Sequence, residues 1–387
     1  MFPLDGVKVL DFSQSAAGPF CGMLLGDMGA DVIKVEPLTG DSFRPLLNGA
    51  WSQIINRNKK SLAINLKTKK GKEIALQLSR DADILLEAFT PGTIDKLGLG
   101  YNEIRDINPA IIYCSLSGYG QDGPYSYRAG YDVCTQAECG MMAATGEPEG
   151  GYVRIGTSPI DYGTGMFAMI GMLLALRVRD ETGTGQLIDV SLFDTGVTWM
   201  NHWFANYAMT AKDPLRLGSG HEFATPYQVF ETKDKPLFIG VASDKSFADF
   251  CREVGLNSLP EDPKFNNAYS RLLHRDELLK IIQDRVKEFP RSELIKKLDP
   301  YGIPYAPVNT ISEVVDDPHI KARGTLIDMA SEKGNIKVPG MAIRLSETPG
   351  AIRRPAPALG EHTDEILSEL GYENKTINRL REKKVIL

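Results

Sequence analysis

Two hydrophobic patterns alternate along the first half of the chain. Short runs rich in β-branched residues, with apolar and polar positions alternating, predict strands, and longer segments with helical spacing predict helices. The predicted strands occupy residues 7–12, 31–35, 62–66, 84–88 and 110–116. Helices are predicted between them at residues 17–28 and 70–81. This alternation predicts an α/β fold with a largely parallel sheet, helices on both faces and ligands at the carboxyl ends of the strands.

A long apolar segment opens the second half. Residues 163–179 carry apolar side chains all around the expected helix, which predicts a buried central helix. The strand and helix that follow are predicted at residues 187–192 and 195–209. Strands at 227–232 and 236–241 around a charged turn then predict a hairpin, with helices after it. We therefore expect a smaller α+β domain over residues 222–320.

Length and charge narrow the class of protein. The chain has 387 residues, and 42% of them are hydrophobic, so it is expected to fold throughout as a multi-domain enzyme. Lys and Arg total 44 against 50 Asp and Glu, for a formal net charge of −6. A chain with this charge has no overall attraction for nucleic acid, which disfavours a DNA- or RNA-binding protein.

No segment predicts export or membrane insertion. The N-terminus has an acid at Asp5 and no basic cluster followed by a long apolar run. The longest apolar stretch, residues 165–178, falls short of the roughly 20 residues that cross a bilayer. The five cysteines form no Cys-x-x-Cys pair, which is typical of a reducing compartment. We expect a cytoplasmic protein with no membrane partner.

Several common catalytic motifs are missing from the sequence. Residues 13–19 lack the Gly-x-Gly-x-x-Gly pattern of dinucleotide sites, which disfavours a plain NAD enzyme. There is no Gly-x-Ser-x-Gly, and the five histidines lack metal-ligand spacing, so no metal is expected. Basic residues near the predicted strand ends could surround the phosphates of a nucleotide-like cofactor, although solvated surface charges are the commoner explanation. They are Arg57, Lys59, Lys60, Lys96 and Arg128.

Asp161 is the strongest candidate nucleophile. It lies just before Gly163 and Gly165, at the expected start of the central helix. The commoner explanation of such a carboxylate is a helix cap or a turn. The functional hypothesis is an accessible nucleophile that the helix N-terminus keeps ionised by holding its pKa low.

A series of short segments runs through nearly the whole chain. They are LDGVKVLD (4–11), GADVIKVEP (29–37), NRNKKS (56–61), PGTIDKLG (91–98), SGYG (117–120), GYD (130–132), TGTGQ (182–186), PYAPVN (304–309) and LGEHT (359–363). Each is weak alone, but in this order and spacing they are specific. The chain resembles the class III coenzyme A transferases, which include formyl-CoA and carnitine CoA-transferases and have the α-methylacyl-CoA racemases as sisters.

The resemblance implies a mechanism and a set of CoA contacts. In these transferases one aspartate attacks the acyl-CoA thioester, passing through an aspartyl anhydride and an aspartyl-CoA thioester, and Asp161 matches it. The implied partners are an acyl-CoA donor and a small carboxylic acid acceptor, with coenzyme A carried as part of the substrate. The implied CoA contacts are Ala16, Ala17, Ile64, Asn65, Leu66, Lys67, Ala88, Phe89, Thr90, Lys96, Ala129, Gly130, Tyr131 and Asp132.

Departures from the family pattern bear on the substrate. Formyl-CoA transferases usually have Gln at the position of Ala16, Arg at that of Pro37, and four glycines where this chain has residues 217–221, so the formyl and oxalate pair is disfavoured. The racemases use a His where Tyr131 stands. Because a tyrosine is a poor base at neutral pH, CoA transfer is favoured over racemisation, which stays the main alternative.

Two alternatives come from other classes of protein. They are a CoA-binding protein without catalysis and a Rossmann-type redox protein; the presence of Asp161 counts against the first and the missing glycines against the second. The resemblance also implies an architecture. A large Rossmann-like domain, residues 1–221 completed by 321–387, would carry the small domain 222–320, and two such ring-like chains would interlock as a homodimer.

Overall fold

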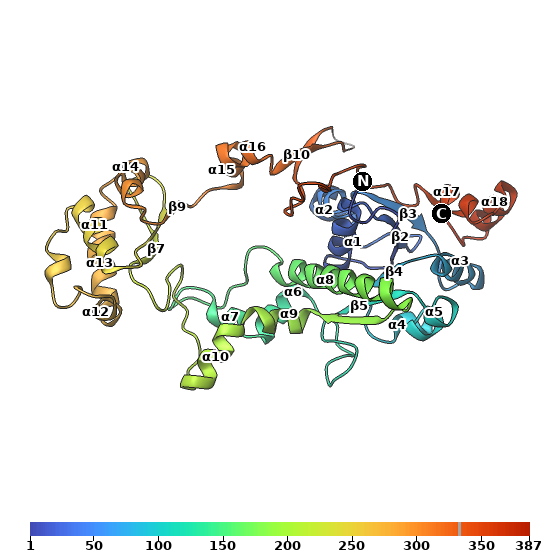
Figure 1. The fold of residues 1–387 in the computed structure, drawn as a ribbon, viewed down its shortest axis with the longest axis horizontal. Coiled ribbons are helices and arrows are strands. Elements are labelled where there is room, and N and C mark those ends of the chain that lie inside the picture. The colour runs from blue at the N-terminus through green and yellow to red at the C-terminus, as the bar shows by residue number, and fades with distance from the viewer. Residues whose placement is uncertain (332–333) are drawn as a thin grey trace. The chain divides into compact units, whose positions relative to one another are not determined.

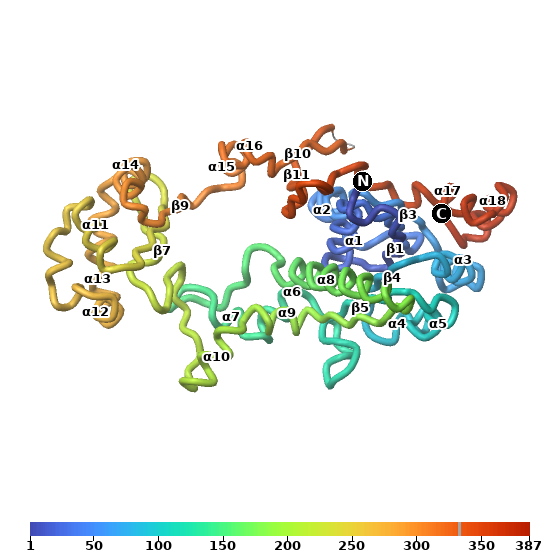
Figure 2. Tube along the Cα trace, viewed as in Figure 1, coloured from blue at the N-terminus to red at the C-terminus, as the bar shows by residue number. Residues whose placement is uncertain are grey.

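The computed structural model describes residues 1–331 and 334–387, which form two compact units (Figure 1). Unit 1 comprises residues 1–141, 155–205 and 321–387, and unit 2 comprises residues 142–154 and 206–320. The chain therefore leaves unit 1 and returns to it twice, as the colours of the trace show (Figure 2).

Unit 1 is built on a six-stranded parallel sheet with the strand order β3-β2-β1-β4-β5-β6. The strands are β1 (Lys8–Asp11), β2 (Asp31–Glu36), β3 (Lys59–Ala63), β4 (Ile84–Glu87), β5 (Ile112–Ser117) and β6 (Leu187–Ser191). The predicted parallel sheet is confirmed. The prediction for β3 began three residues late, because the hydrophobic pattern counted Lys59 and Lys60 as surface residues, whereas both are paired in the ladder with β2.

Apolar clusters lie against both faces of this sheet. In β4, Leu85 belongs to one cluster, and Ile84 and Leu86 belong to the other, as the pleat requires. The helices are α1 (Ala17–Asp27), α2 (Ala50–Ile55), α3 (Lys69–Arg80), α4 (Thr93–Lys96), α5 (Tyr101–Ile107), α6 (Asp132–Glu138), α7 (Met141–Ala144), α8 (Pro159–Thr182), α9 (Leu192–Trp199), α17 (Thr363–Glu369) and α18 (Asn374–Glu382). The sheet is therefore covered on both faces, as the alternation of predicted strands and helices led us to expect.

The long helix α8 is only half buried. Its inner face contacts α1, α9, β5 and β6. Its outer face carries Met166, Ile170, Leu174 and Val178, four residues apart and between 46% and 64% exposed. The prediction of burial on every side is therefore wrong, since none of the described residues of the unit covers the outer stripe. By length and composition alone α8 could cross a membrane, with a mean hydropathy of 1.3 in a window that is 50% buried, a test that core helices also pass.

Unit 2 contains a three-stranded antiparallel sheet of β7 (Tyr227–Phe230), β8 (Leu237–Gly240) and β9 (Tyr305–Pro307). The predicted hairpin is confirmed by β7 and β8. The remaining elements of the second half are α10 (Asn201–Thr210), α11 (Asp244–Val254), α12 (Ala268–Leu273), α13 (Arg275–Val286), α14 (Arg291–Leu298), α15 (Ile311–Asp316), α16 (Pro318–Arg323), β10 (Leu326–Met329) and β11 (Ile336–Pro339). The single helix predicted at 195–209 is instead two, α9 and α10, because α9 ends at Trp199.

Candidate active site

The six strands of unit 1 are parallel, so their carboxyl ends all lie along the same side of the sheet, called here its carboxyl edge. Strands β1 and β4 are neighbours there, and the chain continues from β1 toward β2 on one side and from β4 toward β5 on the other. Such a switch point opens a crevice between the two departing loops, which is where ligands of parallel sheets bind. The loop that follows β1 ends at Ala16, and Ala17 is the first residue of α1. The loop that follows β4 contains Ala88, Phe89 and Thr90.

The remaining predicted CoA contacts follow other strand ends. Ile64 is buried and bridges to Ile386, whereas Asn65 and Leu66 are half-buried and Lys67 is exposed. Lys96 is exposed at the end of α4. The structure thus places residues 64–67, 88–90 and 16–17 at one edge of the sheet.

The stretch of residues 129–132 is held at the end of β5 by a close backbone approach. A Cβ atom on Gly118 would lie 2.6 Å from the Cα of Gly130, so only glycine fits there. The preceding Arg128 lies over the rings of Tyr119 and Tyr125, 4.7 and 4.8 Å from their centroids. This leaves Tyr131 exposed, while Asp132 turns inward as the first residue of α6.

Asp132 caps the N-terminus of α8. Its Oδ2 accepts hydrogen bonds from the backbone N–H groups of Ile160, at 2.8 Å, and Asp161, at 3.1 Å. Its Oδ1 accepts a hydrogen bond from Gln136 Nε2, and Gln136 Oε1 accepts one from the backbone N–H of Ile155 at 3.0 Å. The buried Asp132 carboxylate therefore takes the donors at the helix start that Asp161 was expected to use.

Asp161 itself is half-buried, and no described residue donates a hydrogen bond to its carboxylate. Burial, followed by the negative charge of Asp132, raises the pKa of Asp161 to about 7. The expectation that the helix N-terminus holds this pKa low is therefore wrong, because Asp132 occupies that N-terminus. The result is a carboxyl group with no hydrogen-bond or ion-pair partner among the described residues and with a pKa near neutral pH.

The first turns of α8 lie against the start of α1. A Cβ atom on Gly165 would be 2.7 Å from the carbonyl oxygen of Ala17, so the missing side chain permits this approach. The ring of Tyr162, next to Asp161, packs between Phe20 at 4.8 Å and Trp51 at 6.5 Å, measured between ring centroids. The structure thus brings the turn with Asp161 close to the loop after β1.

Four of the five basic residues proposed to surround phosphates are in ion pairs, and one of the four is Arg128, which pairs with Glu138. Arg57 Nη2 lies 2.6 Å from Asp27, and Lys59 Nζ lies 2.8 Å from Asp11, with all four side chains buried. Lys60 Nζ lies 2.9 Å from Glu365. The proposed phosphate role of Arg57, Lys59 and Lys60 is therefore wrong, since their charges are neutralised within the unit. Lys96 stays available.

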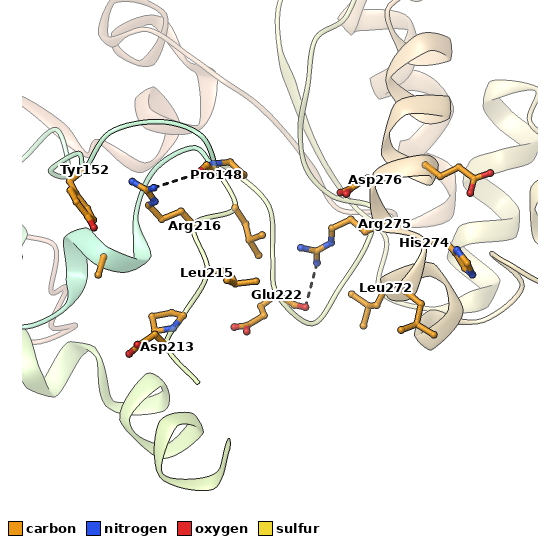
Figure 3. Close-up of a pocket in the computed structure, with 15 residues that line it drawn as sticks. Pro148, Tyr152, Asp213, Leu215, Arg216, Glu222, Leu272, His274, Arg275 and Asp276 are labelled. Atoms are coloured by element: carbon orange, nitrogen blue, oxygen red, sulfur yellow. Dashed lines mark hydrogen bonds between the residues drawn. The ribbon is translucent and has the colours of Figure 1, made fainter. Parts of the chain in front are cut away.

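A cleft of about 1010 Å³ lies in unit 2 (Figure 3). Arg216 stacks on the ring of Tyr152, 4.9 Å from its centroid, and burial lowers the pKa of Arg275. The cleft also has four carboxyl side chains, from Asp213, Glu222, Asp276 and Glu277. Its lining is therefore acidic overall, which does not favour an anionic ligand, and we assign none to it.

Sequence reasoning missed several residues near Asp161. Gln136 and Trp51 belong to no motif, and Asp132 was expected to contact CoA rather than to cap α8. The only signal for the cap was an acid directly before a helical pattern, which does not reveal a helix N-terminus 28 residues further on. Among residues 1–331 and 334–387, no three His, Cys, Asp or Glu side chains are grouped to hold a metal ion.

Comparison with known proteins gives the family. Residues 4–363 match the model of CoA-transferase family III. The chain is 39% identical to the human succinyl-CoA:glutarate CoA-transferase, over 99% of this chain and 90% of that protein. It is 35% identical to the succinate–glutarate CoA-transferase of Agrobacterium fabrum, over 97% of both. A CAIB/BAIF family protein from Brucella suis has a matching crystal structure, with a TM-score of 0.88 and 36% identity over 95% of this chain and 99% of that one. The predicted family is thereby confirmed: the chain belongs to CoA-transferase family III and is an enzyme that transfers CoA from an acyl-CoA thioester to a carboxylic acid.

Proposed function

We propose that the enzyme transfers CoA between short dicarboxylic acids, with Asp161 as the covalent nucleophile. The observation that carries the proposal is the carboxyl group of Asp161, which receives no hydrogen bond from any described residue and lies beside the loop that follows β1. The substrate class follows from the relatives, whose names pair succinyl-CoA or succinate with glutarate.

The proposed reaction needs no external energy source. The Asp161 carboxylate attacks the thioester carbonyl, the C–S bond breaks, and an aspartyl anhydride and CoA thiolate form. The thiolate attacks the Asp161 carbonyl, which gives an aspartyl-CoA thioester and releases the donor acid as a carboxylate. The acceptor carboxylate then attacks the carbonyl of the aspartyl-CoA thioester and displaces the thiolate, which gives a second anhydride between Asp161 and the acceptor. The thiolate attacks the acceptor acyl carbon of this anhydride, the bond from that carbon to the Asp161 oxygen breaks, and the acceptor acyl-CoA and the free Asp161 carboxylate are formed. Each step exchanges a carboxylate for a thiolate, so charge balances and no proton is consumed.

The covalent step can be tested with the donor alone. Incubation with succinyl-CoA and hydroxylamine should leave a hydroxamate at Asp161 that peptide mass spectrometry locates. Asp161→Ala and Asp161→Asn should lower transfer by about a thousandfold or more while CoA binding persists, because neither side chain can form the anhydride. Retained transfer in Asp161→Ala would overturn the mechanism. Exchange of the α-proton of a 2-methylacyl-CoA without transfer would support racemisation instead.

The substrate class has its own test. We expect succinyl-CoA to serve as donor and acids of four or five carbons with two carboxyl groups to be the best acceptors. Acceptor rates should be compared for glutarate, its monocarboxylic analogue valerate, and formate, with CoA esters separated by chromatography. Equal kcat/KM for glutarate and valerate would contradict a dicarboxylate site.

We further propose that CoA lies along the carboxyl edge of the sheet, against residues 16–17, 64–67, 88–90 and 129–132, with Lys96 at a phosphate. Lys96 supports this because it is exposed beside that edge and has no ion pair in the described chain. Lys96→Ala should raise the KM for the donor several-fold with little change in kcat, since a phosphate contact far from the thioester contributes mostly uniform binding. Lys375→Ala, an exposed lysine on α18, is the control. An unchanged KM would remove Lys96 from the site.

We also propose the assembly that the family resemblance implies. The domains would be residues 1–221 with 321–387, and 222–320, and two chains would interlock as a homodimer. The exposed stripe of Met166, Ile170, Leu174 and Val178 supports a second copy as the cover of α8, because an apolar row of this length is typical of an interface. A folded monomer in equilibrium sedimentation at low concentration would contradict interlocking.

The five free cysteines agree with a cytoplasmic location.

A further inference from the structure

The turn between β1 and α1 contains a strained residue. Ser15 has a φ angle of 70°, a left-handed conformation that residues other than glycine rarely adopt. It directly precedes Ala16 and Ala17. Because this conformation costs free energy, contacts around Ser15 must hold it in place.

Asp41 holds the N–H side of Ser15. The backbone N–H of Ser15 donates to Asp41, with distances of 3.2 Å to Oδ2 and 3.4 Å to Oδ1. Asp41 is fixed in turn by Lys34, whose Nζ lies 3.3 Å from its Oδ2, with side chains 3% and 0% exposed. Lys34 Nζ also donates to the carbonyl oxygen of Ser13 at 2.9 Å. The buried Lys34–Asp41 pair therefore holds the turn by hydrogen bonds to the backbone of Ser13 and of Ser15.

Trp51 holds the carbonyl side of the same residue. Its Nε1–H donates to the carbonyl oxygen of Ser15 at 3.1 Å. The Trp51 indole also stacks on Tyr162 with an interplanar angle of 29°. Trp51 thus connects the strained turn to the helical turn that carries Asp161.

We propose that Asp41 and Trp51 are positioning residues that force Ser15 into its left-handed conformation and so set Ala16 and Ala17 relative to Asp161. This inference rests on the proposed function, in which the acyl-CoA thioester reacts at Asp161. Both backbone groups of Ser15 are used by the two side chains, so the turn has little freedom to relax.

A buried ion pair elsewhere in unit 1 gives the matched control. Asp27 pairs with Arg57 at 2.6 Å, with side chains 1% and 2% exposed, at the opposite end of α1. It resembles the Lys34–Asp41 pair in burial and also holds a residue with a positive φ, since Asn58 (φ 61°) donates its side-chain N–H to Asp27 at 2.7 Å, but Asn58 lies outside the turn that precedes Ala16 and Ala17. Loss of Asp27 should therefore lower stability without a specific effect on kcat.

The test is rescue by glycine. Asp41→Ala should lower the kcat of CoA transfer ten- to a hundredfold and change the donor KM less than threefold, because contacts remote from the thioester are kept. Adding Ser15→Gly should bring kcat back to within fivefold of the Ser15→Gly single variant, since glycine adopts a φ of 70° without being forced. Asp27→Ala, measured on its folded fraction, should keep kcat.

Three results would overturn the inference. They are failure of Ser15→Gly to rescue Asp41→Ala, a kcat loss in Asp27→Ala equal to that in Asp41→Ala, or a loss that falls on KM alone. If Asp41→Ala does not fold, Trp51→Phe keeps the ring and removes only the donor to Ser15, and it should show a smaller kcat loss that Ser15→Gly also rescues. A wild-type enzyme that transfers no CoA would refute the proposed function, whereas failed rescue in an active enzyme refutes only this inference.

Discussion

Two carboxyl groups beside helix α1 have opposite surroundings. Asp11, at the end of β1, is fully buried, lies 2.8 Å from Lys59 Nζ and accepts a hydrogen bond from the backbone N–H of Ser13 at 3.0 Å. Asp161 is half-buried, receives no hydrogen bond from a described residue and faces the like charge of Asp132. Burial alone therefore does not decide what a carboxyl group does; its partners do. A paired carboxylate supports the fold, whereas an unpaired one is available to react.

The largest effect on stability is expected when the ion-pair partner of Asp11 is removed. Lys59→Met should lower the free energy of unfolding by about 3–5 kcal/mol, because it leaves a buried carboxylate without a counter-charge. Chemical denaturation at fixed protein concentration measures this loss.

Two further variants test whether the stability is lost because a buried charge has no counter-charge. Lys70→Met removes an exposed pair with Glu73 on α3 and should cost no more than about 0.5 kcal/mol. The double variant Asp11→Asn with Lys59→Met should recover part of the stability, because no unpaired charge remains. Equal losses in Lys59→Met and Lys70→Met would show that the buried pair is not what stabilises this region.

The sequence predicted the sheet well and its buried charges poorly. Strands such as β2 and β4 are short runs rich in aliphatic residues, so local pattern was sufficient to find them, and their alternation with helical segments predicted the parallel arrangement. Lys59 has the appearance of a surface residue in the sequence, and its partner Asp11 lies 48 positions earlier. Lys59 at the start of β3 meets Asp11 at the end of β1 because the strand order is β3-β2-β1. No local sequence pattern contains this order.

The candidate active site was also predicted only in part from the sequence. Asp161 could be found because it lies in a glycine-rich helix start that resembles a known motif. Its pKa could not be predicted, because Asp132 belongs to another helix and caps α8 only in the folded chain. The exposed stripe on α8 was also missed, since an apolar helix gives the same pattern whether its cover belongs to the same chain or to another molecule.

A smaller effect on stability is expected from Asp161, and it should depend on pH. Since its pKa rises from an ordinary value near 4 to about 7 on folding, the folded protein holds a proton that the unfolded chain has released between these two pH values. Asp161 therefore contributes stability at pH 4 that is lost as pH rises through 7, and Asp161→Asn should lack this pH-dependent contribution, while Glu87, whose pKa is raised in the same way, still contributes in both proteins. The variant should be inactive yet more stable than the wild type at pH 8, by about 2 kcal/mol for a half-buried group.

The measurement is thermal or chemical unfolding of both proteins at pH 4 and at pH 8. The stability difference should be close to zero at pH 4 and largest at pH 8. Asp31→Asn, an exposed aspartate at the start of β2, is the control and should show no such trend. An Asp161→Asn protein that is less stable than the wild type at pH 8 would mean that Asp161 has a stabilising partner after all.

The smallest predicted effect concerns the charge that faces Asp161. Asp132→Asn keeps an oxygen to accept from the N–H groups of Ile160 and Asp161 but removes the negative charge, so the pKa of Asp161 should fall. Burial is the larger cause of the raised pKa, so we expect the acid limb of kcat/KM to move down by only about 0.5–1 pH unit. Because the carboxylate is the reactive form, the variant should keep more of its own maximal activity at pH 6 than the wild type does. Glu138→Gln changes a carboxylate on the same helix that pairs with Arg128 and should leave the limb in place. An acid limb that stays fixed or moves upward in Asp132→Asn would show that the Asp132 charge does not act on Asp161.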